Sequence, residues 1–220
     1  MTTTSKRIAC FCEATFDADV PSAADLASEP GVEELISSGN FGALTCPACS
    51  RRLTPEFPFR LAGVKGFGEV FMIPEADRVA YERGVLDYPL GTPGRVAVGF
   101  PELAEKVLIA GLDLDDRVIE IMKYYLLTGS RGSTGTEGGE GSEDEGPDPD
   151  VTIRYRGREG GRHLFHIVGM KENEVGVARL ADELYRKIAA GVEGRVAEEP
   201  FADFCVPPWV SLRRLTGAAG

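Results

Sequence analysis

The sequence of 220 residues predicts an α+β fold: a small cysteine-bearing β module with a short helix insertion, then a helical pair, then a β-hairpin plus helix. Close cysteine pairs stand among short extended segments, at Cys10/Cys12 and at Cys46/Cys49. Residues 100–127 repeat apolar side chains with a helical period, and residues 151–168 alternate as a hairpin does. With 43% hydrophobic residues, the chain can bury a substantial core.

The N-terminal module is expected to begin with a hairpin whose strands are Lys6–Cys10 and Glu13–Val20, since polar and apolar side chains alternate. A short helix follows at residues 32–40, with apolar side chains on one face and a glycine near its end. Phe41–Thr45 is expected to be a strand that leads into the second cysteine pair.

Two further extended segments complete the module. Arg52–Leu61 leaves the second cysteine pair, and Glu69–Ile73 forms another strand. Because Pro55 and Pro58 interrupt the first of these segments, it suits an edge strand or an irregular crossing.

The two cysteine pairs are expected to bind one metal ion. Thiolates in two short pairs, with a spacer that lets the pairs meet, suit a tetrahedral four-sulfur site, whose common occupant is zinc. No export signal or membrane-spanning run is apparent, so a cytoplasmic protein with reduced thiols is expected. We therefore expect one structural Zn²⁺ per chain, bound by Cys10, Cys12, Cys46 and Cys49. This is a zinc-ribbon-like arrangement.

The first pair sets a geometric condition. In a regular strand, residues two apart share a face but keep about 7 Å between their Cα atoms. Zinc–sulfur bonds of about 2.3 Å require sulfurs about 4 Å apart. Cys10 and Cys12 can therefore share an ion only if the backbone bends between them; otherwise the site is weakened or free of metal. The second pair has ordinary spacing, with Ser50 where a glycine commonly follows.

A thiol-redox pair is the competing interpretation of Cys46 and Cys49. A Cys-x-x-Cys motif has a lowered thiol pKa when its first sulfur caps a helix. Pro55 and Pro58 follow too closely for the long helix of a thioredoxin-like site. The two neighbouring arginines would stabilise thiolates in either kind of site, so they do not discriminate.

A helical pair is expected after a turn-rich connection. Asp77–Gly84 predicts a helical turn and Arg95–Gly99 a strand. One helix then opens at Phe100, and a second follows the acid-rich break at residues 111–116. Both carry apolar stripes of the kind that usually packs in a core: Leu103, Val107 and Leu108, then Val118, Ile119, Met122, Tyr125 and Leu126.

The order of these motifs over residues 6–127 is itself informative. Beyond the cysteine pairs it includes Gly39-Asn40-Phe41, Phe57-Pro58-Phe59, Glu102–Lys106 and Gly111–Glu120. This order resembles the CpXC family of bacterial proteins, named for Cys-Pro-x-Cys motifs. The resemblance implies a metal-binding domain whose biochemical role is not established. The first pair departs from the family pattern, because it is one residue shorter and lacks the proline.

A glycine-, serine- and acid-rich tract, residues 128–150, precedes the C-terminal region. It holds −6 of the net charge of −11, from Arg131 and seven acids: Glu137, Glu140, Glu143, Asp144, Glu145, Asp148 and Asp150. With almost no apolar residue, it predicts a flexible linker, and its acids lack the spacing of a calcium-binding loop.

The C-terminal region, residues 151–216, is expected to be a hairpin with one helix. Val151–Tyr155 and His163–Val168 are its strands. The helix is expected from about Glu174 to Ala190, on a stripe formed by Val177, Leu180, Leu184 and Ile188. Because this core is thin, the region is expected to dock on residues 95–127.

The histidines and the last cysteine of this region are expected to be structural. His163 and His166 are three apart, so a strand places them on opposite faces and a shared metal ion is not expected. Cys205 lies between Phe204 and Val206 and is expected to be a buried apolar thiol.

No Walker loop, dinucleotide-binding turn, His-Glu-x-x-His motif or Gly-x-Ser-x-Gly motif occurs, so no enzymatic activity is expected. We expect a zinc-stabilised module that interacts with another protein and not with a membrane. The alternative is a nucleic-acid-binding zinc ribbon, which the net charge of −11 disfavours. Its cations would be Lys6, Arg7, Arg51, Arg52, Arg60 and Lys65. A thiol-redox protein using Cys46 and Cys49 ranks third.

Overall fold

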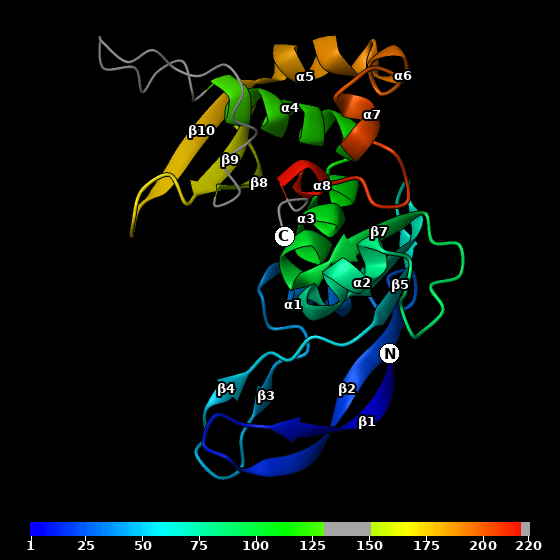
Figure 1. Cartoon of the computed structure of the whole chain (residues 1–220), viewed down its shortest axis with the longest axis vertical. Coiled ribbons are helices and arrows are strands. Elements are labelled where there is room, and N and C mark those ends of the chain that lie inside the picture. The colour runs from blue at the N-terminus through cyan, green and yellow to red at the C-terminus, as the bar shows by residue number, and fades with distance from the viewer. Residues whose placement is uncertain (130–150, 217–220) are drawn as a thin grey trace. The chain divides into compact units, whose positions relative to one another are not determined.

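The computed structural model describes residues 1–129 and 151–216 (Figure 1). The chain forms two compact units, Met1–Gly111 and Leu112–Gly220. Both contain strands and helices, so the predicted α+β class is confirmed. Residues 130–150, where a linker is predicted, lie outside the described residues. None of the helices in the described ranges is long and apolar enough to cross a membrane.

A five-stranded mixed sheet forms the frame of the first unit, in the order β1-β2-β5-β6-β7. Its strands are β1 (Thr2–Ala9), β2 (Thr15–Asp25), β5 (Phe59–Val64), β6 (Gly68–Ile73) and β7 (Arg95–Val98). The β1–β2 and β5–β6 pairs are antiparallel, and the β2–β5 and β6–β7 pairs are parallel. Because β2 meets β5 only through Ala23–Asp25, the rest of the β1–β2 hairpin extends beyond the sheet as a two-stranded ribbon.

Helices α1 (Gly31–Ser37) and α3 (Gly99–Gly111) contact each other and share the core of the first unit with the sheet. The 3-10 turn η1 (Glu75–Asp77) and α2 (Arg78–Glu82) follow β6. Burial alternates along β5, as a strand with one face on a core requires. The largest buried side chains of this core include Phe41, Phe59, Leu61, Met72 and Leu103.

A second, two-stranded sheet consists of β3 (Leu44–Thr45) and β4 (Arg52–Leu53). The longer strand predicted from Phe41 is therefore wrong at its start. The N–H groups of Asn40 and Phe41 both bond to the Leu35 carbonyl at the end of α1. The Phe41 ring then packs on Phe59, with 4.6 Å between ring centroids. Because Phe41 closes α1 and packs in the core, the strand begins only at Leu44.

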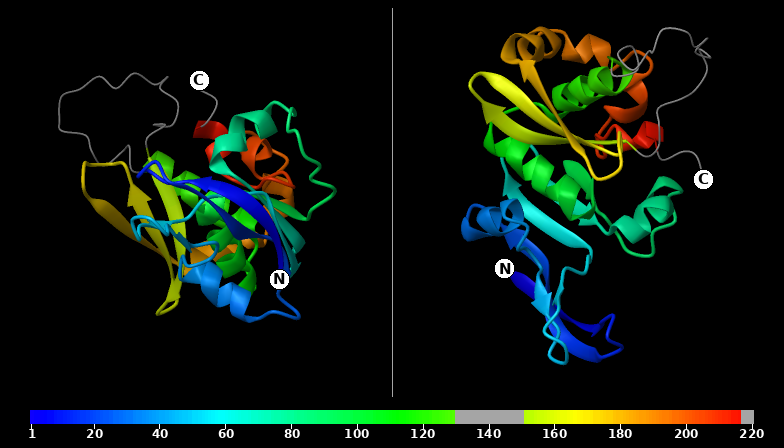
Figure 2. Two further views of the ribbon diagram at one scale, coloured as in Figure 1. Left: turned by 90° about the horizontal axis from the view of Figure 1, so that it is seen from below. Right: turned by 90° about the vertical axis from the view of Figure 1, so that its left-hand side faces the viewer.

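The second unit contains an antiparallel sheet in the order β10-β9-β8. Its strands are β8 (Thr152–Glu159), β9 (Arg162–Val168) and β10 (Val175–Ala181). The helices are α4 (Asp116–Gly129), α5 (Asp182–Ala189), α6 (Val192–Arg195), α7 (Phe201–Phe204) and α8 (Arg213–Thr216). Helices α4 and α5 contact each other, α4 contacts β8 and α5 contacts β10 (Figure 2).

The predicted helix from Glu174 to Ala190 is wrong in its first half, which forms β10, so the predicted hairpin is a three-stranded sheet. All seven residues of β10 pair with β9 in unbroken register. The β-branched side chains of Val175 and Val177 favour a strand, and Gly176 disfavours a helix. The helix begins only at Asp182.

Candidate metal centre

Four cysteine side chains converge where the tips of two hairpins meet. The Sγ atoms of Cys10 and Cys49 lie 3.7 Å apart, and so do those of Cys12 and Cys46. All four sulfurs lie within 4.8 Å of one another. Each of these close pairs joins the β1–β2 hairpin to the β3–β4 hairpin, and the ribbon views show the two hairpins side by side (Figures 1 and 2). The structure thus brings together all four cysteines that the sequence predicts as metal ligands.

The first cysteine pair lies on a tight turn between β1 and β2. The Cys10 N–H donates to the Ala14 carbonyl at 2.9 Å, and the Glu13 N–H donates to the Cys10 carbonyl at 2.9 Å. Glu13 has a φ of 68°, which reverses the chain directly after Cys12. The backbone therefore bends as a shared ion requires, although the pair has only Phe11 between its cysteines.

The second cysteine pair lies on a turn of the same plan that is one residue longer. The Cys46 N–H donates to the Arg51 carbonyl at 2.9 Å, and the Ser50 N–H donates to the Cys46 carbonyl at 2.9 Å. Ser50 has a φ of 58°, a backbone conformation in which glycine is favoured. No helix follows Cys49, because the chain enters β4 directly. The helix-capped thiol of a thioredoxin-like site therefore has no counterpart here.

The donor set and its spacing fit a tetrahedral metal ion. Four sulfurs bonded to zinc at about 2.3 Å would lie about 3.8 Å apart, close to the two measured distances of 3.7 Å. Thiolates are soft ligands that suit zinc, copper(I) and iron–sulfur clusters. Cys10 and Cys46 are buried, whereas Cys12 and Cys49 are exposed. The site is thus shielded on one side and open to solvent on the other.

Local hydrogen bonds make the cysteines electrostatically unequal. The N–H groups of Cys49 and Ala48 donate to the Cys46 sulfur and lower the pKa of that thiol from 9.0 to about 7, although burial opposes this. The Arg51 N–H favours the thiolate of Cys49, but the neighbouring sulfurs, with Cys12 foremost, and burial raise its pKa to about 11. The crowded sulfurs therefore resist a second negative charge, which a bound cation would offset.

An exposed aromatic side chain stands directly beside the site. Phe11, between the first two cysteines, is 86% exposed. The guanidinium of Arg51, which follows the second pair, lies 5.7 Å from the centre of the Phe11 ring. This cation–π contact joins the two hairpins on the side of the site that faces solvent.

The predicted nucleic-acid-binding cations are dispersed among different local contacts. Arg52 donates to the Gly39 carbonyl at 2.9 Å and to Asn40 Oδ1 at 2.6 Å. Arg60 is paired with Glu69 at 2.7 Å. Lys6 and Arg7 lie on β1, and Lys65 lies in the turn between β5 and β6. Nucleic-acid binding by these residues stays the untested alternative.

A carboxylate that sequence reasoning missed braces the first unit. Glu56 Oε1 accepts the Phe100 N–H at 2.8 Å, at the start of α3, and Oε2 accepts the Glu75 N–H at 2.8 Å, at the start of η1. A carboxylate is favourable at both positions, because it satisfies N–H groups at helix starts. No local capping motif signals this role, since Glu56 lies far from both partners in sequence.

The histidines lie on opposite faces of β9, as predicted. His163 is fully buried, whereas His166 is half-buried. His163 Nδ1 lies 3.1 Å from the Tyr155 hydroxyl, and Nε2 lies 3.2 Å from Asp182 Oδ1. These partners were not predicted, and they make His163 a buried polar link between the sheet and the start of α5.

Cys205 is 1% exposed, so the prediction of a buried thiol is confirmed. Its sulfur lies 3.8 Å from the Arg117 carbonyl oxygen, to which it donates.

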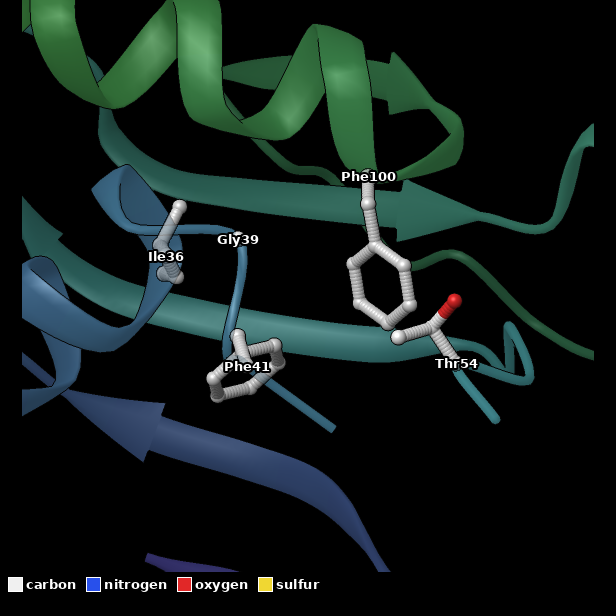
Figure 3. A pocket seen from close by; sticks show the side chains of 5 residues that line it. All are labelled: Ile36, Gly39, Phe41, Thr54 and Phe100. Atoms are coloured by element: carbon white, nitrogen blue, oxygen red, sulfur yellow. The ribbon is translucent and has the colours of Figure 1, made fainter. Parts of the chain in front are cut away.

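A small pocket of about 110 Å³ lies in the first unit (Figure 3). It is lined by Ile36, Gly39, Phe41, Thr54 and Phe100. The Thr54 hydroxyl is the polar side-chain group of this lining, which contains no titratable side chain. The pocket therefore provides no acid, base or metal ligand.

The similarity to known proteins includes the part of the chain that carries the cysteines. A family model described as CpXC protein matches residues 8–123, more than half of the chain. The chain belongs to the CpXC family. The match includes both cysteine pairs and ends within α4. An uncharacterized protein of Treponema pallidum (strain Nichols) is 22% identical to this CpXC chain over 197 residues, which cover 83% of this chain and 86% of that relative. No solved structure matches.

Proposed function

We propose that this CpXC protein is a non-enzymatic interaction module, held together by one structural Zn²⁺ on Cys10, Cys12, Cys46 and Cys49. The observation that supports the proposal is the convergence of these four sulfurs within 4.8 Å from two hairpins of separate sheets. Bound zinc would supply the cross-link between the hairpins. The protein's own contribution is the pair of hydrogen-bonded turns that direct the four sulfurs toward one another.

The number of sulfur ligands favours a structural role over a catalytic one. Catalytic zinc sites usually keep one position open for water or substrate, whereas structural sites use four protein ligands. Four cysteine sulfurs, which here lie within 4.8 Å of one another, would fill a tetrahedral coordination sphere by themselves. Zinc also has no redox chemistry, so a structural site leaves the thiols inert. We therefore assign no reaction to this centre.

Phe11 and Arg51 support a role in protein interaction. Aromatic and arginine side chains are enriched at the energetic centres of protein interfaces. Phe11 and Arg51 come from different hairpins and meet beside the cysteine cluster. Closing the metal site would hold both side chains in place and lower the entropy lost when a partner binds. The partner that fits them is a protein with an apolar pocket edged by acidic groups.

The test combines metal analysis with photo-crosslinking in cells. A photoreactive amino acid replaces Phe11, or Val85 as a control that is 66% exposed in the same unit. Native mass spectrometry is expected to find about one zinc per chain, and near zero in Cys46→Ser. Position 11 is expected to give discrete protein adducts that position 85 does not give and that Cys46→Ser abolishes.

Two outcomes would count against separate parts of the proposal. A wild-type chain that is folded but carries no metal would refute the zinc site. A zinc-loaded chain whose adducts at position 11 match those at position 85, or survive Cys46→Ser, would refute the zinc-dependent interface.

A further inference from the structure

One hairpin of the second unit exposes a cluster of large apolar side chains. Val168, Val175 and Val177 are 45%, 56% and 50% exposed. Val168 and Val175 are direct cross-strand partners, and Val177 follows on the same face of the sheet. Isolated exposed apolar residues are normal on a protein surface, but a contiguous group of them marks an interaction site.

The same residues lie on a strand with an open edge. β10 is the outer strand in the order β10-β9-β8, and in the part of the chain that the structure describes no strand pairs with its other side (Figure 1). Native proteins protect such edges with prolines, bulges or several charges. β10 contains no proline, pairs with β9 without a break, and has Arg179 as its single charged residue. Its outer edge is therefore suited to accept another strand.

We propose that β10 pairs antiparallel with β10 of a second copy of this chain, across a two-fold axis. The full length of Val175–Ala181 overlaps with its copy only when the axis passes through Ala178. In this register Val175 faces Ala181 of the second copy, and Val177 faces Arg179 of the second copy. Residues of equal parity stay on one face, so the exposed valines of both copies join on the outer face of a continuous sheet.

The side chains are complementary to themselves in this register. The two Arg179 side chains are diagonal neighbours rather than direct partners, so their like charges lie farther apart than in a direct cross-strand pair. The aliphatic stem of each Arg179 covers Val177 of the other copy while its guanidinium stays in solvent. The two Val177 side chains are diagonal neighbours, within reach of each other across the axis. An isologous contact of this kind closes as a dimer and leaves no open edge at β10.

The oligomeric state of the full chain tests this pairing. Sedimentation analysis is expected to show a concentration-dependent transition from the 23.6 kDa monomer to a dimer. Val177→Lys places a cation opposite Arg179 of the second copy and is expected to weaken the dimer by about tenfold or more. Val177→Glu removes the same valine but places a carboxylate opposite Arg179 of the other copy on both sides of the axis. Its dimer is therefore expected to be at least tenfold more stable than that of Val177→Lys.

A charge-swap variant and a distant control complete the experiment. Adding Arg179→Glu to Val177→Lys restores opposite charges and is expected to rescue the dimer. Val85→Lys, at a side chain 66% exposed in the first unit, is expected to leave the dimer unchanged. Circular dichroism of each variant confirms that it is folded, as expected for changes at exposed positions. A wild-type chain that stays monomeric at about 1 mM, equal effects of Val177→Lys and Val177→Glu, or a failed charge-swap rescue in folded protein would overturn the proposal.

Discussion

At the scale of the residue, His163 shows how burial selects one protonation state. The Tyr155 hydroxyl can donate to Nδ1 and the Nε2–H can donate to Asp182, which satisfies a neutral imidazole completely. If Nδ1 were also protonated, the Tyr155 hydroxyl could no longer donate to it and would have to rotate to accept the N–H instead. Burial foremost, and the charge of Arg158, lower the pKa of His163, although Asp182 opposes the shift. The neutral ring is therefore the form that the folded second unit stabilises.

The pH dependence of stability follows from this shift. Because the pKa of His163 is lower in the folded chain than its unfolded value of 6.5, its contribution to stability is present above pH 6.5 and is lost as the pH falls through the folded pKa. The free energy of unfolding of the second unit, measured with urea and Trp209 fluorescence, is expected to fall as the pH of the wild type is lowered from about 7.5 to 5. His163→Gln is expected to flatten this dependence, and His166→Gln, on the opposite face, is not. Equal slopes in all three proteins would contradict the assignment.

At the scale of the element, the two cysteine turns reach one geometry with different lengths. Both are closed by an N–H bond back to the first cysteine of the pair, and both reverse the chain at a residue of positive φ, Glu13 or Ser50. A side chain in this left-handed conformation costs about 1 kcal/mol relative to glycine. Each turn thus stores a small strain that hairpin pairing and, in the proposed function, zinc would offset.

Relieving that strain is a direct test of the turn. Ser50→Gly is expected to stabilise the first unit by about 0.5–1 kcal/mol, measured by urea unfolding at a fixed excess of zinc. Ser38→Gly is a contrasting control, because Ser38 has a φ of −81° at the end of α1 and its hydroxyl donates to the Leu35 carbonyl. That control is expected to gain no stability. A Ser50→Gly protein no more stable than the wild type would show that the turn is not strained at this position.

At the scale of the whole molecule, the four-cysteine cluster and the single tryptophan lie in different units. The four cysteines lie within Met1–Gly111, whereas Trp209, the only tryptophan of the sequence, is 4% exposed in Leu112–Gly220. Each unit has buried apolar residues of its own. Trp209 emission therefore reports whether a change at the cysteine cluster reaches the other unit.

Removing the metal is expected to unfold the hairpins of the first unit alone. Cys46→Ser, or an excess of a strong chelator, is expected to reduce the far-UV strand signal while the Trp209 emission maximum stays unchanged. Cys205→Ser, at a thiol 1% exposed in the second unit, is the reciprocal control and is expected to keep the zinc. A red shift of Trp209 emission on chelation would show that the two units unfold together.

The sequence alone predicted the features that depend on residues close together in the chain. Short cysteine spacing was enough to name the four candidate ligands, and helical periodicity located α3 and α4. An apolar setting was enough to predict the buried Cys205. In each case the signal lies within a few residues, because turns close locally and helices repeat every few positions.

Tertiary structure alone decided the features that depend on distant partners. Residues 174–190 carry an apolar stripe that fits a helix, but pairing with β9 made their first half a strand, because a sheet edge satisfies the backbone as well as a helix does. Glu56 and His163 acquired their roles from residues that only folding brings near. Cys10 and Cys12 could be named as ligands from sequence, but only the folded turn shows that their backbone bends enough to share one ion with the second pair. That bend depends on a hydrogen-bonded hairpin whose pairing is not encoded in the spacing of the two cysteines.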